Sequence, residues 1–304
     1  MNDYHFQCTE DIIDTRIDRC IADAYEEISR SYIQKLIKDG LVSVNGKICK
    51  ASYRVSPGDM VSFSAPDAVL PDILPEDIPI EILYEDNDVI VVNKPKGMVV
   101  HPAPGHYSGT LVNALMYHCG KDLSGINGVM RPGIVHRIDM DTTGTLLVCK
   151  NDRAHLAIAG QLKEHSINRV YTALAHGMIK DDEGRIDAPI GRDEKDRKRM
   201  SVNIKNGKEA ITNFRVLKRS DKFTLIECRL ETGRTHQIRV HLSSIGHPIV
   251  GDEVYCRLKP PMSIKGQALH AGTIGFIHPT TGEYIEITAP LPEYFTELLS
   301  HVFP

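Results

Sequence analysis

The chain is organised around the stretch GIVHRIDMDTTGTLLVCK, residues 133–150. Residues 145–149 form a short apolar run bounded by turn residues, which is typical of a buried strand. The loop before this run concentrates charge in His136, Arg137, Asp139 and Asp141. Charged side chains on a loop that a rigid strand supports are typical of an active site, whereas a charged surface turn is the alternative for this stretch alone.

The composition is that of an ordinary globular protein, with 41% hydrophobic and 25% charged residues in a chain of 304. At roughly 150 residues per domain, this length predicts two domains. No apolar run approaches the ~20 residues that a membrane-spanning helix needs. The N-terminus is polar and acidic, so it does not resemble a signal or transit peptide.

The cysteines and histidines show no pattern of a structural metal or of disulfide bonds. The seven cysteines include no CxxC pair, which argues against a disulfide framework and a zinc site. His236 and His241 are five residues apart, which is not the spacing of two ligands on one helical face. We therefore expect no metal and a reducing, cytoplasmic location.

Charge is distributed unevenly along the chain. The formal net charge is −4, but residues 67–88 contain eight acidic and no basic residues, so the remainder carries +4. Residues 192–199, RDEKDRKR, hold five basic residues against three acidic ones. Because local patches attract phosphate, the net charge does not exclude a nucleic-acid partner.

Residues 1–65 are predicted to form a small first domain. Helical spacing covers residues 15–28, and a second helix over 30–39, capped by Ser29, ends at Gly40. A hairpin with an Asn45-Gly46 turn and a strand over 60–64 follow.

The segment SRSYIQKLIKDGLVSVNGKICK resembles the S-four-type (alpha-L) RNA-binding domain. The resemblance implies that Lys35 and Lys38 contact phosphate, whereas a solvated helix face is the alternative.

The four prolines in residues 66–80 predict a semi-extended linker, and residues 81–304 form the second domain. The expected fold class is α+β: a mostly antiparallel mixed-sheet domain preceded by a small α/β RNA-binding domain. The expected strands cover residues 80–84, 89–93, 168–176, 210–216, 223–230, 266–276 and 284–289, and the expected helices 110–117, 152–164 (capped by Asp152), 231–242 (after an initial turn) and 293–299. Residues 187–200 are expected to be a basic loop. Tyr171 faces away from its apolar neighbours Val170 and Leu174, which places it at a wet edge or in a cleft.

Several motifs in the second domain resemble those of the RluA-type family of RNA pseudouridine synthases. The family motif H-R-[LI]-D-x-x-T-[ST]-G matches residues 136–144, and the resemblance continues through NKPKGMVVHPAPG, RVYTALAHG, IDAPIGRDEKDRKRM, ETGRTHQIRVHL and GHPIVGDEVY. The layout is most similar to the RluD-like branch, which modifies large-subunit ribosomal RNA. The resemblance implies the pseudouridine synthase fold and an isomerase that converts uridine to pseudouridine, a reaction that requires no cofactor.

The resemblance also implies a role for each site residue. Asp139 acts at C1′ of a flipped-out uridine, Arg234 is its ion-pair partner, and Tyr171 helps to remove the C5 proton. The residues expected to contact or open the RNA are Arg137, His136, Lys35, Lys38, Arg197, Lys198 and Arg199. Asp141 is not expected to act as a second catalytic acid.

Three alternatives stay open at this point. The same chemistry could act on transfer RNA, since RNA is recognised largely by shape and loop structure. The chain could instead be a non-catalytic RNA-binding factor of ribosome assembly. It could also be a glycosidase or nucleosidase, although such enzymes usually need two carboxylates. A monomer is expected.

Overall fold

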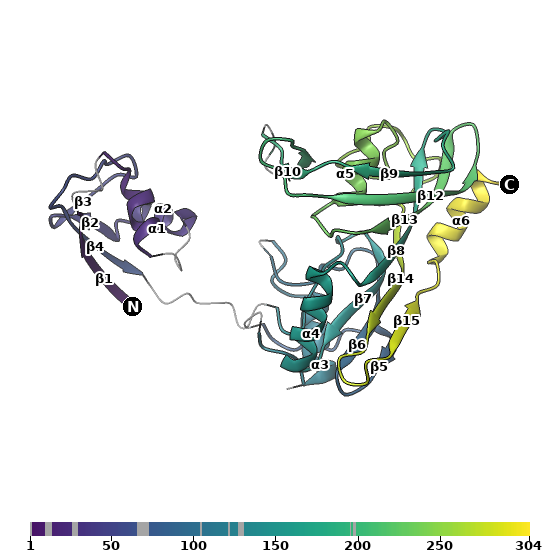
Figure 1. The fold of residues 1–304 in the computed structure, drawn as a ribbon, viewed down its shortest axis with the longest axis horizontal. Helices are drawn as coiled ribbons and strands as arrows, with labels where there is room; N and C mark the ends of the chain where they lie inside the picture. Colours follow the sequence, from purple (N-terminus) through teal and green to yellow (C-terminus); the bar gives the residue numbers. More distant parts are fainter. Residues whose placement is uncertain are drawn as a thin grey trace. The chain divides into compact units, whose positions relative to one another are not determined.

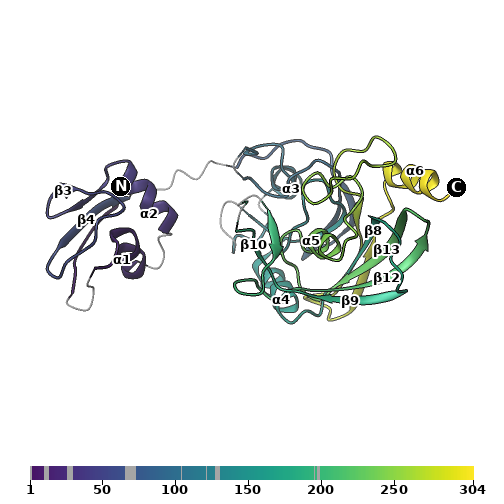
Figure 2. The same ribbon diagram turned by 90° about the horizontal axis from the view of Figure 1, so that it is seen from above.

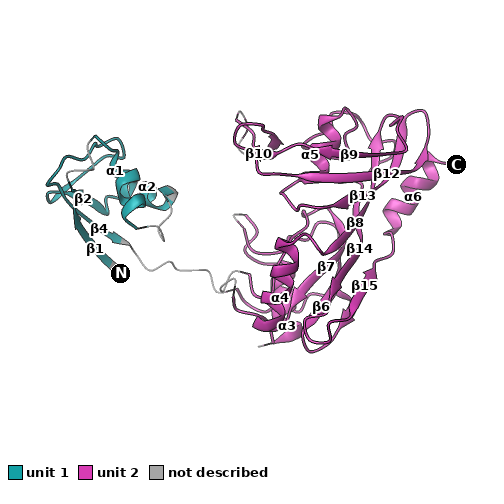
Figure 3. Cartoon of the chain, in the orientation of Figure 1, with its two compact units in different colours: residues 1–71 teal, residues 72–304 magenta. Residues whose placement is uncertain are grey.

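The computed structural model of the chain describes residues 2–9, 14–25, 30–65, 73–103, 105–120, 122–126, 131–194, 196 and 199–304. The chain divides into two compact units, residues 1–71 and 72–304 (Figure 3). Within the described residues, none of the helices has the length and apolar character that crossing a membrane requires.

Unit 1 is a four-stranded antiparallel sheet with two short helices. The sheet order is β1 (Asn2–Gln7), β4 (Met60–Ala65), β2 (Val42–Val44) and β3 (Lys47–Ile48). The helices α1 (Ile17–Ala24) and α2 (Arg30–Lys38) share one apolar core with the sheet. The predicted stop at Gly40 and the hairpin turn at Asn45-Gly46 are confirmed, because all three residues have positive φ angles of 74°, 50° and 76°.

One nine-stranded sheet runs through unit 2 (Figure 1). Its order is β5 (Glu81–Glu85), β6 (Val89–Lys94), β7 (Thr143–Cys149), β14 (Leu269–Ile277), β8 (Asn168–His176), β13 (Phe223–Leu230), β12 (Ile211–Arg219) and β9 (Glu183–Asp187), and β15 (Tyr284–Thr288) also pairs with β14. The pair β7–β14 is parallel and the other pairs are antiparallel. The predicted α+β class is therefore confirmed.

The helices in the described part of unit 2 cover both faces of this sheet. On β6, Ile90 and Val92 pack with α3 (Leu111–Cys119), whereas Val89 and Val91 pack with α4 (Asp152–Lys163). The helices α5 (Gln237–Ser244) and α6 (Glu293–Val302) join the same core as α3. Figure 2 shows α3 and α4 on opposite sides. Because β7 is buried along all seven residues, it is the rigid support expected for the loop that precedes it.

Three local expectations differ from the structure. Residues 73–80, predicted to belong to the linker, pack against α3: the Glu76 N–H donates to the Asn113 carbonyl, and the Asn113 amide donates to the Leu74 carbonyl. The cap of α4 is Asn151 rather than Asp152, because the Asn151 carboxamide oxygen accepts the Ala154 N–H. The expected loop 187–200 contains part of a hairpin formed by β10 (Ile190–Arg192) and β11 (Met200–Val202).

Gly144 allows the parallel strands to approach each other at the start of β7. It pairs with Ala271 of β14, has a φ of 108°, and leaves no room for a Cβ, which would collide with the Ala271 carbonyl. Both the backbone angle and the contact require glycine. The β7–β14 junction therefore depends on this one residue.

Replacing Gly144 by alanine is expected to lower the free energy of unfolding by at least about 3 kcal/mol, since backbone atoms cannot yield as a side chain can. Gly160→Ala in α4 is the matched control, because nothing lies within 4 Å of its Cβ position and helix propensity favours alanine. Thermal unfolding of the two variants measures the difference. Equal stability of Gly144→Ala and wild type would contradict the role of this contact.

Candidate active site

Lys94, at the end of β6, holds the loop that carries Asp139. Its buried ammonium donates to the carbonyls of Pro95 (2.7 Å), Met98 (2.9 Å) and Met140 (2.9 Å). Burial lowers the pKa of Lys94 to about 7, although the charges of Asp141 and Asp139 oppose the shift. The Met140 carbonyl also accepts the Gly97 N–H. The hydrogen bonds of this buried lysine, on the strand next to β7, thus hold the charged loop in place.

Asp139 is held by an arginine of α5. Its Oδ2 accepts from the Arg239 guanidinium at 2.9 Å, and the remaining nitrogens of Arg239 donate to both carboxylate oxygens of Asp252, at 2.7 and 2.9 Å. The side chain of Arg239 is 6% exposed and that of Asp252 is 0% exposed. Burial opposes the charge of Arg239, but hydrogen bonds and charges of Asp252 and Asp139 raise its pKa. Arg239 therefore aims Asp139 through a fixed fork.

Asp252 is itself secured by the backbone. Its Oδ1 accepts the N–H groups of Val254 and Tyr255, at 2.9 and 3.0 Å. Burial works against its ionised form, but the hydrogen bonds from Arg239 and these backbone groups lower the pKa of Asp252. The carboxylate consequently remains a permanent anchor for Arg239.

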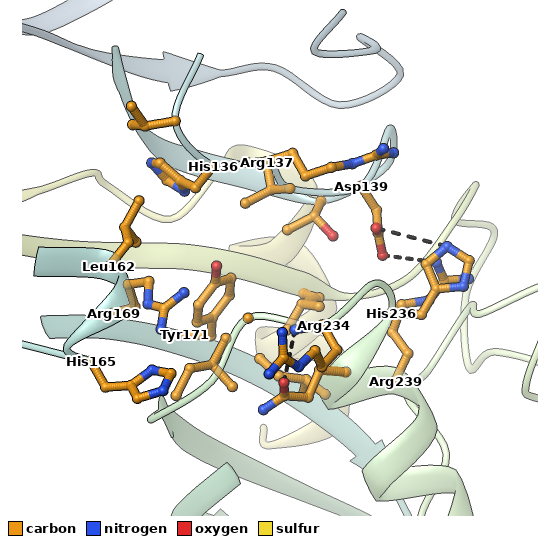
Figure 4. A pocket seen from close by; sticks show the side chains of 18 of the residues that line it. His136, Arg137, Asp139, Leu162, His165, Arg169, Tyr171, Arg234, His236 and Arg239 are labelled. Carbon is orange, nitrogen blue, oxygen red and sulfur yellow. Dashed lines mark hydrogen bonds and ion pairs between the residues drawn. The ribbon is translucent and has the colours of Figure 1, made fainter. Parts of the chain in front are cut away.

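A cavity of about 480 Å³ opens above this network, within the range of ~300–1,000 Å³ that is usual for ligand pockets. Figure 4 shows Asp139 on one side and Arg239, His236 and Tyr171 around the space below it. The charged or aromatic side chains that line the cavity include Arg137, Asp139, Arg169, Tyr171, His236 and Arg239. These side chains come from the loop before β7, from β8 and from α5 or its preceding turn.

Tyr171 lies in the cleft rather than at a wet edge. It is 7% exposed and lines the cavity from β8. Burial raises the pKa of Tyr171, with Arg169 opposing the shift and Asp139 adding to it. Arg169, two residues earlier on β8, is also 7% exposed, and its guanidinium donates to the Glu231 carbonyl. The tyrosine is therefore a neutral phenol beside a buried cation.

His136 and Arg137 are adjacent but point to different environments. His136 accepts the Leu147 N–H of β7 on Nε2, at 3.0 Å, and burial with the charge of Arg169 lowers its pKa to about 3. It fastens the loop to the strand as a neutral ring. Arg137 is exposed and lines the cavity. Both residues line the cavity, but only Arg137 is exposed.

The partner of Asp139 is Arg239, not Arg234 as the sequence led us to predict. Arg234 lines the cavity, but its Nε donates to the Glu209 carbonyl at 2.8 Å. The helix begins only at Gln237, so Arg234 lies on the turn before it, whereas Arg239 lies in the buried first turns of α5.

Three of the other predicted residues, Arg199, Lys35 and Lys38, do not line this cavity. Arg199 precedes β11, and its guanidinium lies 5.2 Å from the ring centre of Tyr255. Lys35 and Lys38 are exposed on α2 of unit 1. Arg197 and Lys198 lie outside the described residues.

Four residues of the network were not anticipated: Lys94, Arg239, Asp252 and Tyr255. A signal for two of them was present in the sequence. Arg239 stands between Ile238 and Val240, and Asp252 follows an apolar pair and a glycine, so both are charged residues in apolar surroundings. Buried charges have to be paired, which makes such positions candidates for an ion pair.

Two groups of side chains among the described residues have metal-ligand chemistry, Glu85 with His118 and Cys119, and Asp86 with Asp88 and His278. Both are already engaged in hydrogen bonds. His118 pairs with Glu85 at 2.8 Å, and His278 pairs with Asp86 at 2.7 Å. Neither group lines the cavity.

The fold and the cavity define an α+β enzyme that places a single arginine-held carboxylate beside a buried tyrosine. Two family models match the chain: RNA pseudouridylate synthase over residues 88–244 and S4 domain over residues 15–61. The RNA pseudouridine synthase YlyB of Bacillus subtilis is 55% identical over 302 residues, which cover 99% of each chain. The ribosomal large subunit pseudouridine synthase D of Zymomonas mobilis is 46% identical over 295 residues, covering 94% of this chain and 93% of the relative.

A solved structure supports the same relationship. The human RNA pseudouridylate synthase domain containing 1 superimposes with a TM-score of 0.60 at 26% identity, covering 74% of this chain and 89% of that one. The chain belongs to the RNA pseudouridylate synthase family and is an RNA pseudouridine synthase with an S4 domain. The family resemblance predicted from the sequence motifs is thereby confirmed.

The same conservative change at Arg239 and at Arg234 tests which of the two arginines holds Asp139. Arg239→Lys is expected to lower the rate of pseudouridine formation at least about 100-fold with RNA affinity largely retained, because an ammonium cannot bridge two carboxylates as the planar fork does. Arg234→Lys is expected to cost much less. Single-turnover rates and RNA dissociation constants measure both, and a larger rate loss in Arg234→Lys would contradict the geometry.

Proposed function

We propose that Asp139 acts at C1′ of a uridine that has left its stack and entered the cavity. The observation that carries this proposal is the arrangement of its carboxylate: Arg239 occupies Oδ2, and Oδ1 accepts no hydrogen bond from the described residues. An oxygen with free lone pairs is the one that can approach an electron-poor carbon. Asp139 thus has one oxygen, Oδ1, available for the substrate, while Arg239 holds the other and fixes the orientation of the side chain.

The reaction rearranges bonds within one nucleotide. The N1–C1′ bond breaks, the base turns, C5 bonds to C1′, C5 loses its proton and N1 gains one, so the atoms balance and no electrons are transferred to or from the substrate. Asp139 either bonds to C1′ between these steps or stabilises the positive charge that develops there. Both routes require the carboxylate near C1′.

Tyr171 and Arg137 are assigned to the base and to the opened RNA. Tyr171 lies in the cavity as a phenol whose pKa is raised by burial. It would contact the flipped uracil and assist the removal of the C5 proton by hydrogen bonding, not as a free phenolate. Arg137 is exposed beside Asp139 and would fill the space that the uridine leaves. His136 supports both by holding the loop.

The proposed substrate is structured RNA, and specifically large-subunit ribosomal RNA. Two sources support it: the relatives named ribosomal large subunit pseudouridine synthase D, in Zymomonas mobilis and in Pseudomonas aeruginosa, and the S4 domain in unit 1. Lys35 and Lys38 on α2 would bind phosphate, as would Arg197, Lys198 and Arg199 before β11. Transfer RNA is the second candidate substrate and is distinguished by experiment.

Asp139→Asn is expected to bind RNA with unchanged affinity and to make no pseudouridine, because the amide cannot attack or stabilise C1′ as an anion does. Tritium release from RNA labelled at C5 of uridine measures turnover, and mapping of pseudouridine in cells that carry only this variant identifies the substrate. Loss of pseudouridine from large-subunit ribosomal RNA supports the proposed target, whereas loss from transfer RNA alone would replace it. Full tritium release by the variant would refute the role of Asp139.

The role of unit 1 is tested by the double charge reversal Lys35→Glu/Lys38→Glu. If both lysines contact phosphate, RNA affinity falls and the slope of log K against log salt concentration decreases by roughly 1.5, at about 0.7–0.9 per phosphate contact. Lys180→Glu/Lys222→Glu is the matched control, since it changes the total charge equally at two exposed lysines of unit 2 that do not line the cavity. An unchanged salt slope in the α2 variant would refute the contact.

A further inference from the structure

Tyr255 determines which ring nitrogen of His236 carries a proton. The Tyr255 Oη lies 2.8 Å from His236 Nδ1 and accepts the Met200 N–H of β11 at 2.9 Å. If Nδ1–H donated to Tyr255, the phenol hydrogen would have no acceptor among the described residues. Because buried donors are almost always paired, Tyr255 donates to Nδ1, and the ring carries its hydrogen on Nε2.

The Nε2 of this ring faces the free oxygen of Asp139. The distance from His236 Nε2 to Asp139 Oδ1 is 3.8 Å, while Arg239 holds Oδ2. Burial lowers the pKa of His236, with the charges of Asp139 and Arg239 acting in opposite directions, so the ring is neutral near pH 7. A distance of 3.8 Å exceeds that of a hydrogen bond by under 1 Å, which a small side-chain rotation can close.

The backbone also brings the ring to this place. His236 has a φ of 58°, a left-handed angle that non-glycine residues seldom adopt, immediately before α5 begins at Gln237. Uncommon backbone conformations at functional sites persist where the surroundings fix them, and the His236 ring is in contact with Tyr255. The ring plane is nearly perpendicular to that of Tyr255, with the centroids 5.6 Å apart.

We propose that His236 is a positioning residue for Asp139. Held as the Nε2–H tautomer by Tyr255, it presents a hydrogen-bond donor to Oδ1 and directs this oxygen toward C1′ when uridine fills the cavity. The opposite tautomer would turn a lone pair toward the carboxylate and repel it. The proposal rests on the proposed action of Asp139 and names the two side chains, His236 and Tyr255, that aim its reactive oxygen.

The pair His236→Gln and His236→Met separates donation from packing. Both replacements are unbranched, similar in length and subject to the same backbone angle, but only glutamine can offer an N–H near the position of Nε2. Single-turnover rate, RNA dissociation constant and melting temperature are measured for each in the full chain. We expect His236→Met to lower the rate at least about tenfold, which is modest against the ~100–1,000-fold loss of a well-aligned donor, with RNA affinity unchanged.

His236→Gln is expected to recover most of the lost rate at the same melting temperature as His236→Met. If the two variants lose activity equally, or if neither loses any, the proposal is overturned. A loss of RNA affinity in both, with no loss of single-turnover rate at saturating RNA, would assign His236 to binding and would also overturn it.

Tyr255→Phe tests the tautomer without relying on activity. The ¹⁵N spectrum of the histidine-labelled protein is expected to show His236 with hydrogen on Nε2 in the wild type, assigned by the signal that His236→Gln lacks, and a mixture of tautomers in Tyr255→Phe. An unchanged tautomer in Tyr255→Phe, or hydrogen on Nδ1 in the wild type, would overturn the inference. Failure of the proposed function appears separately, as activity in Asp139→Asn.

Discussion

The guanidinium of Arg239 is the interaction on which the site depends. It is buried between two carboxylates and makes two hydrogen bonds to Asp252 and one to Asp139. Removing one partner of a buried ion pair typically costs about 3–5 kcal/mol, because the other charge is left uncompensated. One cation therefore has two effects: it ties the segment after Val250 to α5, and it fixes Asp139 without using the oxygen that faces the cavity.

The fold places both partners of this ion pair, Asp139 and Arg239, on rigid supports. Asp139 precedes β7, which is buried on both faces of the sheet, and Gly144 lets β7 lie parallel against β14. Lys94 fixes the loop from β6 by binding three carbonyl oxygens. Arg239 comes from a helix that is buried through most of its length. Catalytic geometry has to be held within fractions of an ångström, and rigid strands and buried helices provide this better than loops.

Local patterns in the sequence predicted what depends on nearest neighbours along the chain. The Asn45-Gly46 hairpin, the stop at Gly40 and the strand after Asp139 follow from backbone preferences and apolar periodicity, which act over a few residues. The choice between Arg234 and Arg239 could not be made in that way. It depends on where α5 begins, and that start is set by the left-handed turn at His236 and by packing against β12 and the β10–β11 hairpin. The contacts of Lys94 and Asp252 likewise join strands and loops far apart in the sequence.

We propose above all that the cavity receives a flipped uridine with C1′ directed at residue 139. A structure of the Asp139→Asn variant bound to its substrate RNA tests this most directly. We expect the target uridine to lie in the cavity with its C1′ about 3–3.5 Å from the residue 139 side chain, as in a near-attack arrangement. Arg239 is expected to stay paired with Asp252. A uridine that remains stacked in the RNA, or a C1′ that lies nearest to Asp141, would contradict it.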